Sequence, residues 1–256
     1  MLRFLVALII FAAITTAYAS TDNTKNVKPE YYKWEYLQIS DSSSFNDWKA
    51  LGLKRWQFAD SVGKAILFKR CGQSRKAVFS QMSITASFND WKKNGINKMD
   101  FVTFFKNTVV FKKDGKLEYM QMPIQNSFQD WNKLGMKGWE YSCTLDKTII
   151  FKHSKDNAFL KFQYFQLPST SIFDEWNKLG NNGWEFTCVL NKALIFKRSK
   201  PYKKIEYIQL PATSPLSEYQ KLGKNGWEYI LKFGNTLIFK RTLKACQPTI
   251  PAVKKK

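Results

Sequence analysis

The chain has 256 residues, and its 41 Lys and Arg residues against 20 Asp and Glu residues give a net charge of +21 at pH 7. This excess favours anionic partners such as nucleic acid, acidic polysaccharide or lipid headgroups, through a field that salt screens. Charge alone identifies none of them, and it also fits a surface that keeps the protein soluble. The single His and the four Cys residues, which have no C-x-x-C spacing, exclude a conventional zinc motif.

The N-terminus has the pattern of an export signal. Arg3 precedes an apolar run at residues 4–13, and Ala17-Tyr18-Ala19 has the small-x-small pattern of a signal-peptidase site. The apolar run is shorter than the roughly 20 residues that a membrane span needs. We therefore predict a cleaved signal peptide at 1–19, a linker at 20–31, and a secreted or periplasmic mature chain without a transmembrane span. Cleavage removes one Arg and no acid, which lowers the net charge from +21 by one, to +20.

The rest of the chain contains five copies of one sequence repeat. An aromatic residue near the start of a short helix recurs every 40 to 45 residues, at Trp48, Trp91, Trp131, Trp176 and Tyr219. The predicted repeats cover residues 32–70, 75–113, 116–153, 160–198 and 203–241, and a basic tail follows at 242–256.

Each repeat predicts a strand, a short helix and a hairpin, and the third repeat shows the signals clearly. Residues 118–122 alternate between polar and apolar, which is typical of a strand. Ser127 is the expected helix N-cap with Asp130 completing a capping box, and Gly135 is expected just past the end of the helix. The fold class is therefore predicted as α+β, with five tandem β-α-β-β repeats whose antiparallel sheets each carry one helix.

The hairpin of the third repeat predicts its own register. A three-residue loop at 145–147 would place Trp139, Tyr141 and Cys143 on one face, and Glu140 opposite Lys152 on the other. The same twelve-residue offset joins Gln57 with Lys69, Asp100 with Lys112, Glu185 with Lys197, and Glu228 with Lys240. We expect cross-strand ion pairs at four of the five positions.

The same register brings aromatic and basic side chains together on the inner face. The expected pairs are Trp56 with Arg70, Trp139 with His153, Trp184 with Arg198, and Trp227 with Arg241. A cation over an indole ring can grip a ligand, or it can close the core edge of a small module.

The order strand, helix, Leu-Gly-x-x-Gly-Trp-Glu and Ile-Phe-Lys-Arg, best seen at residues 134–152, 179–198 and 222–241, resembles a known pattern. It is similar to small, mostly bacterial strand–helix–hairpin modules catalogued as a domain of unknown function. The first copy departs at Arg55-Trp56-Gln57 and the second at Met99-Asp100. The resemblance implies a fold and transfers no functional residue.

A module of about 40 residues buries too little core to stand alone, so the modules are expected to pack together. Two arrangements are open: a ring resembling the fivefold α/β propellers with the helices outside, and an elongated array. Cys143 and Cys188 are expected to be buried small apolar groups. A Cys71–Cys246 disulfide would need Cα atoms within about 7 Å, which a ring allows.

The basic residues suggest a binding surface, and no catalytic constellation accompanies them. His153 occupies a slot that holds Arg or Lys in the other copies, so we predict no enzyme, no metal and no cofactor. Our first hypothesis is multivalent binding of an anionic polysaccharide, lipid surface or nucleic acid by a basic rim. The alternative is a structural component held by protein partners or by self-association. The predicted rim residues are Lys93, Lys133, Lys178 and Lys221 on the helices, with Lys54, Arg55, Lys98, Lys137 and Lys224 near their ends.

Overall fold

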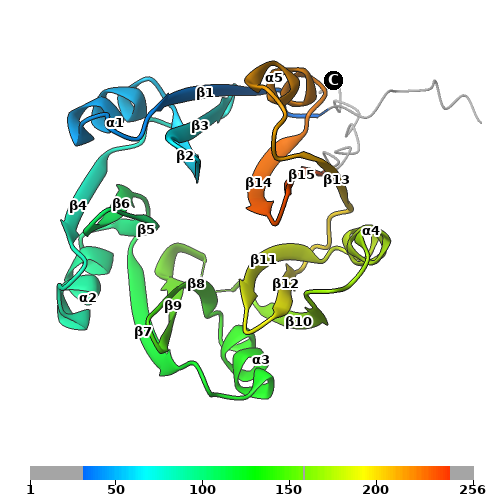
Figure 1. Ribbon diagram of the computed structural model, residues 1–256. Coiled ribbons are helices and arrows are strands. Elements are labelled where there is room, and N and C mark those ends of the chain that lie inside the picture. The colour runs from blue at the N-terminus through cyan, green and yellow to red at the C-terminus, as the bar shows by residue number, and fades with distance from the viewer. Residues whose placement is uncertain (1–30, 158, 243–256) are drawn as a thin grey trace, which may run out of the picture.

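The computed structural model describes residues 31–157 and 159–242, which form five modules of one strand, one helix and a hairpin (Figure 1). The α+β prediction is confirmed at this level. The predicted signal peptide, most of the linker, Cys246 and nearly all of the basic tail lie outside the described residues.

The five modules share one order of elements. The first has β1 (Trp34–Ser40), α1 (Phe45–Leu53), β2 (Gln57–Val62) and β3 (Ala65–Cys71), and the second has β4 (Phe79–Ser83), α2 (Phe88–Ile96), β5 (Met99–Phe105) and β6 (Thr108–Lys113). The third has β7 (Leu117–Pro123), α3 (Phe128–Met136), β8 (Glu140–Leu145) and β9 (Thr148–Ser154), and the fourth has β10 (Phe162–Pro168), α4 (Phe173–Asn181), β11 (Glu185–Leu190) and β12 (Ala193–Ser199). The fifth has β13 (Ile205–Pro211), α5 (Leu216–Lys224), β14 (Glu228–Phe233) and β15 (Thr236–Thr242). A 3-10 helix, η1 (Lys155–Asn157), follows the third module.

Each module folds its strands into a separate antiparallel sheet with the third strand in the middle, as in the order β7-β9-β8. The expected pairing of Glu140 with Lys152 is present, but the predicted three-residue loop is wrong. Leu145 pairs with Thr148, which leaves a two-residue turn, and Asp146 takes the positive φ of 51° that such turns require.

A β-bulge reconciles the short turn with the predicted register. The pairing shifts between Tyr141 and Cys143, so one extra residue lies in β8, and all five hairpins share this shift. Beyond the bulge the faces exchange. Cys143 therefore lies opposite Ile150, on the face of Glu140 and Lys152, and not on the face of Trp139 as predicted.

The helix signals are confirmed in part. Ser127 is the N-cap of α3, but the complete capping box expected there forms in α1 and α2 and not in α3. The hydroxyl of Ser127 accepts a hydrogen bond from the backbone N–H of Asp130 at 3.3 Å. Gly135 was expected beyond the helix end, but it lies within the last turn of α3. A Cβ at this position would lie 2.3 Å from the carbonyl oxygen of Phe162, so glycine is needed for close packing on the next module. Gly138, with φ of 88°, ends the turn instead.

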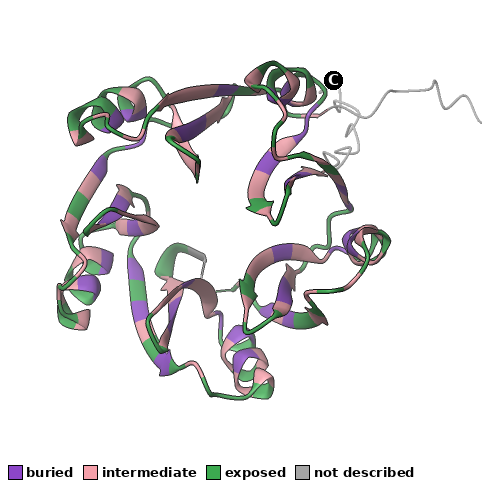
Figure 2. Cartoon of the chain, in the orientation of Figure 1, coloured by how far each residue is buried: buried purple, intermediate pink, exposed green. Residues whose placement is uncertain are grey.

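The core lies between the modules as much as within them. Trp131 stacks on Tyr141 of its own hairpin at 5.5 Å between ring centroids and meets Tyr164 of the next module edge-on, also at 5.5 Å. The side of each sheet that faces away from its own helix completes the core of the preceding module, as Cys143 and Ile150 do beside Trp91. Figure 2 shows the resulting distribution, with buried residues along the strands and exposed residues on the helices and turns.

The packing returns from the fifth module to the first. The hydroxyl of Tyr36 in β1 donates to the carbonyl oxygen of Trp227 at 2.8 Å and accepts from the backbone N–H of Tyr229 at 2.7 Å. Tyr207 makes the same two contacts between the fourth and fifth modules. The first and fifth modules are therefore in contact in the same way as consecutive modules. Figure 1 shows the five modules around a common centre with the helices outside.

Candidate functional site

The shared orientation of the modules creates two unlike faces. On one face the loop after each helix meets the end of the third strand or the linker that leaves it. Arg70 donates to the carbonyl oxygen of Lys54 at 3.3 Å, and the backbone N–H of Asp114 donates to that of Lys98 at 2.6 Å. Gly183 lies against Tyr202 of the linker between the fourth and fifth modules. We call this surface, made of the post-helix loops and the intermodule linkers, the linker face.

The opposite surface carries the hairpin turns and the loops that lead into the helices. The backbone N–H of Asp41 donates to the carbonyl oxygen of Lys64 at 3.0 Å, and the equivalent bond from Ile124 to Lys147 is 2.9 Å. The acidic residues of each first helical turn lie at this end, as Asp47 does in α1. We call this surface the hairpin face.

The structure divides the nine predicted rim residues into two groups. The helix lysines are exposed, but Lys93, Lys133 and Lys221 form ion pairs with acids three residues earlier in their own helices. Within the described part of the chain, Lys178 and the post-helix group form no ion pair. We use the name post-helix group for Lys54, Arg55, Lys98 and Lys137, which follow their helices, and for Lys224, the last residue of α5; all are exposed on the linker face.

Two of these post-helix residues have unusual backbone conformations. Arg55 has φ of 69° and Lys98 has φ of 65°, at the position that Gly138, Gly183 and Gly226 occupy in the other modules. A non-glycine residue in the left-handed region costs roughly 1–2 kcal/mol. The first two modules therefore place a basic side chain where folding alone favours glycine.

The linkers add further basic side chains that the sequence analysis did not single out. They lie on the linker face because each linker joins the end of a third strand to the start of the next sheet. Those that are exposed and form no ion pair within the described ranges are Arg75, Lys76, Lys116, Lys161, Lys200, Lys203 and Lys204. The signal that could have found them was the alternation of Lys-rich linkers with the repeats.

The aromatic–basic pairs lie at the edge of the same face. The guanidinium carbons of Arg70, Arg198 and Arg241 lie 4.3–4.4 Å from the ring centroids of Trp56, Trp184 and Trp227, respectively. The rings of Trp139 and His153 are 5.4 Å apart. Arg70 and Arg241 also bind Glu35 and Glu206 across the strands, while Arg198 binds Gln163. These arginines are thus held by several contacts within the protein.

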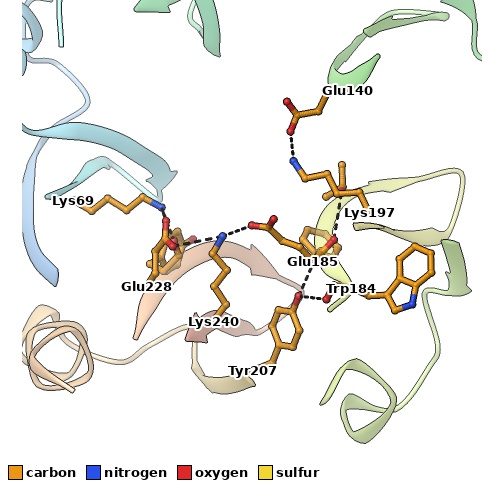
Figure 3. A network of polar contacts seen from close by, with 11 residues as sticks. Lys69, Glu140, Trp184, Glu185, Lys197, Tyr207, Glu228 and Lys240 are labelled. Carbon is orange, nitrogen blue, oxygen red and sulfur yellow. Dashed lines mark hydrogen bonds and ion pairs between the residues drawn. The ribbon is translucent and has the colours of Figure 1, made fainter. Parts of the chain in front are cut away.

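Four of the five lysines of the twelve-residue offset form ion pairs between modules, and Figure 3 shows those of Lys69, Lys197 and Lys240. We predicted that Lys152 would pair with Glu140 in its own hairpin, but its Nζ binds Asp100 of the preceding module at 2.8 Å. Glu140 instead binds Lys197 of the following module. The same pattern joins Lys240 to Glu185 and Lys69 to Glu228, the latter at 2.7 Å across the fifth and first modules. We call these eight residues the acid–lysine network.

The ion pairs of the network stabilise the charged forms of its acids and lysines. The attraction of Lys240 lowers the pKa of Glu185 to about 2 against the opposing effect of burial. Burial by itself would raise the pKa of Glu140 and of Glu228, but neighbouring lysines bring both below the usual range. The pKa of Lys240 is raised, because Glu185 and Glu228 outweigh the effect of its burial.

The network is interrupted at one junction. Gln57 stands where the other modules have an acid, so Lys112 has no carboxylate there and lies 3.9 Å from Asp114 instead. Phe79 likewise replaces the tyrosine whose hydroxyl bridges neighbouring modules elsewhere. The junction between the first and second modules therefore lacks two interactions that the other four have.

An open pocket of about 580 Å³ lies where the network approaches the linker face. Glu140, Glu185 and Glu228 line it together with Lys197 and Lys240. Its outer wall comes from linker residues, including Lys200, Pro201 and Lys203. Acids and lysines of the network therefore line this pocket together with Lys200 and Lys203, two basic residues of the linker that form no ion pair within the described residues.

The cysteines separate into two kinds. Cys143 is buried and Cys188 is partly buried, both in the cores between modules, and burial raises the pKa of Cys188 to about 12. Cys71 lies at the end of β3. Its predicted bond to Cys246 stays a prediction, because Cys246 lies outside the described residues.

Two structural surveys cover only the described residues. Among residues 31–157 and 159–242, no group of three or more His, Cys, Asp or Glu side chains could hold a metal ion. None of the helices in this part of the chain has the length and apolar character that a membrane span needs. In comparisons with protein-family models, curated proteins and solved structures, nothing matched this chain.

Proposed function

We propose that this protein is an exported, non-enzymatic repeat protein whose five modules form a propeller-like ring and bind an anionic polymer or surface through the linker face. The observation that carries the proposal is the difference between paired and unpaired basic residues. Three helix lysines are neutralised within their own helices, and four lysines of the acid–lysine network bind acids of neighbouring modules. The exposed basic residues of the post-helix loops and linkers lack such partners within the described residues and gather on the linker face. The hairpin face has fewer exposed lysines without an ion pair in the described chain, namely Lys64, Lys106, Lys147, Lys192 and Lys232.

Multivalency makes this arrangement effective. Each module contributes one or more unpaired charges, and a partner with repeated negative charges engages several of them at once. The apparent affinity then exceeds that of any single contact. Because the contacts are exposed, they should weaken as the salt concentration rises.

The proposal is tested by binding of the mature protein to immobilised heparin, duplex DNA and anionic vesicles across a salt series. A linker-face variant would carry Lys137→Glu, Lys161→Glu and Lys224→Glu, all at exposed positions. A hairpin-face variant with Lys64→Glu, Lys147→Glu and Lys232→Glu makes the same change in net charge. The expected result is salt-sensitive binding that the first variant loses and the second largely keeps. Equal losses in both variants, or no binding by the unaltered protein, would remove the proposal.

A structural role through protein partners or self-association is the second candidate. Large apolar side chains are exposed on the protein surface, among them Leu53, Ile96 and Phe159. Self-association that depends on protein concentration and persists at high salt would favour this candidate.

A further inference from the structure

Exposed apolar side chains gather on the linker face, beside its unpaired basic residues. Leu53, Ile96 and Met136 are the last residues of α1, α2 and α3, and they are 49–67% exposed. The linkers add Val78, Tyr202 and Phe159, the last of which is 77% exposed. On the hairpin face the exposed large apolar residues in the described chain are Ile172 and Val189.

The helix ends show that folding does not demand this apolar character. The position of Leu53, Ile96 and Met136 is Asn181 in α4 and Lys224 in α5. The same helix therefore ends equally well with a polar residue. Three exposed aliphatic side chains at one repeated position, all beside unpaired basic residues, call for a partner with both apolar and anionic character.

From this combination we infer that the linker face docks on an anionic phospholipid bilayer. The inference rests on the proposed function and names its partner. Heparin and DNA offer phosphate or sulfate groups but no apolar interior in which Leu53 or Ile96 could be buried. A bilayer offers both, because basic side chains bind the headgroups while apolar side chains enter the boundary with the acyl chains.

A small pocket on this face is lined by both apolar and basic side chains. It measures about 300 Å³, and its lining includes Met136, Phe159, Lys161, Arg198 and Tyr202. The apolar members lie beside basic groups that suit a lipid phosphate. The pocket is thus suited to a headgroup with the first carbons of its acyl chains.

The charge on this face can supply substantial attraction to the membrane. Each basic side chain near an anionic surface strengthens binding by about fivefold at moderate salt. The apolar residues should then keep part of the binding when salt screens the charges, since burial of apolar surface is not screened.

The test separates the bilayer from other anions with an apolar variant. Leu53→Asn, Ile96→Asn and Met136→Asn place at each site the residue that α4 already carries there. The matched control replaces the apolar residues of the hairpin face, as Ile172→Asn and Val189→Asn. Thermal unfolding and circular dichroism check that both variants fold as the original does.

Binding is measured with vesicles of phosphatidylcholine alone, with vesicles containing phosphatidylglycerol, and with heparin. The expected result is that the apolar variant binds the anionic vesicles at least tenfold more weakly but binds heparin unchanged, while the control matches the original protein. If the apolar variant binds anionic vesicles as well as the original does, or loses heparin binding equally, the bilayer inference is wrong and anion binding stands. If the original protein binds neither heparin nor anionic vesicles, the proposed function itself fails.

Discussion

At the scale of single residues, the acid–lysine network shows how one charge can stabilise a contact between modules. The Nζ of Lys240 binds Glu185 of the fourth module and lies 3.5 Å from Glu228 of its own hairpin. Replacement of Glu185 leaves Lys240 with the more distant carboxylate alone. At the interrupted junction, Lys112 already lacks the corresponding acid because residue 57 is Gln.

Opposite changes at these two positions should have opposite effects on stability. Glu185→Gln removes a charged hydrogen bond and is expected to lower the free energy of unfolding by roughly 1–3 kcal/mol. Gln57→Glu offers Lys112 a partner and is expected to raise that free energy by up to about 1 kcal/mol, since Lys112 is more exposed than the other lysines of this kind. Urea denaturation of both variants measures the difference. If Gln57→Glu instead lowers the free energy of unfolding, Gln57 packs better at this junction than Glu does.

The same carboxylate predicts a pH dependence. The pKa of Glu185 is about 2 in the folded protein and about 4.3 in an unfolded chain. Its contribution to stability is therefore complete above about pH 4.3 and is lost as the pH falls toward 2. Urea denaturation at a series of pH values should show this loss, and Glu185→Gln should make the decline shallower. An identical decline in the variant would assign the acid sensitivity to other groups.

The residue scale also shows what the sequence could predict. The twelve-residue offset correctly placed Glu140 opposite Lys152, because backbone pairing within a hairpin follows from local spacing. It did not predict that Lys152 binds Asp100 of the preceding module. Which carboxylate a long side chain reaches depends on how neighbouring sheets approach each other, and local spacing holds no information about that approach.

At the scale of elements, the hairpin and the helix end show a similar division. Polar and apolar alternation predicted each strand, but it could not distinguish a three-residue loop from a two-residue turn with a bulge. Both solutions bring Glu140 opposite Lys152, and they differ in the face that Cys143 takes. Gly135 was read as a helix terminator from its local context, while its actual role is close approach to Phe162 of the next module.

The loop after each helix leads to a prediction on stability and binding together. Arg55→Gly and Lys98→Gly remove the left-handed strain of a non-glycine residue and should each raise the free energy of unfolding by roughly 0.5–1 kcal/mol. Because both substitutions remove charge from the linker face, they should weaken binding to heparin at the same time. Urea denaturation and a binding assay on the double variant measure both effects. The reverse change, Gly138→Ala, serves as the control and should destabilise, as Gly138 has φ of 88°.

At the scale of the whole molecule, the five modules depend on one another for their cores. Every core cluster combines the helix side of one module with the side of the next module's sheet that faces away from its own helix. The cluster of Tyr219, Tyr229 and Tyr36 joins the fifth module to the first in this way. The sequence established five repeats but left a ring and an array open, because the period of a repeat does not specify the rotation between copies. From the sequence, the tyrosines that bridge the modules could be identified only as strand residues.

The contact between the fifth and first modules predicts that loss of one module is more damaging than a cut in the chain. A chain that ends at Lys204 lacks the fifth module. It exposes Tyr36 of the first module, which packs on the fifth, and Trp176 on the helix side of the fourth module. It should lose cooperative unfolding. A circular permutant of residues 31–242 keeps all five modules, and joining these two ends is feasible because the guanidinium carbon of Arg241 lies 4.1 Å from the ring centroid of Tyr31.

The best place for the new ends is between Arg75 and Lys76, in the linker between the first and second modules. That junction lacks the bridging tyrosine and the acid of the network, so a cut there disturbs the fewest interactions between modules. The permutant is expected to unfold in one cooperative transition, whereas the truncated chain is expected to unfold gradually or to aggregate. Thermal unfolding followed by circular dichroism compares the two directly. Cooperative unfolding of the truncated chain at the original temperature would mean that the contacts between Tyr36 and Trp227 contribute little, and that neighbouring modules stabilise each other without closure.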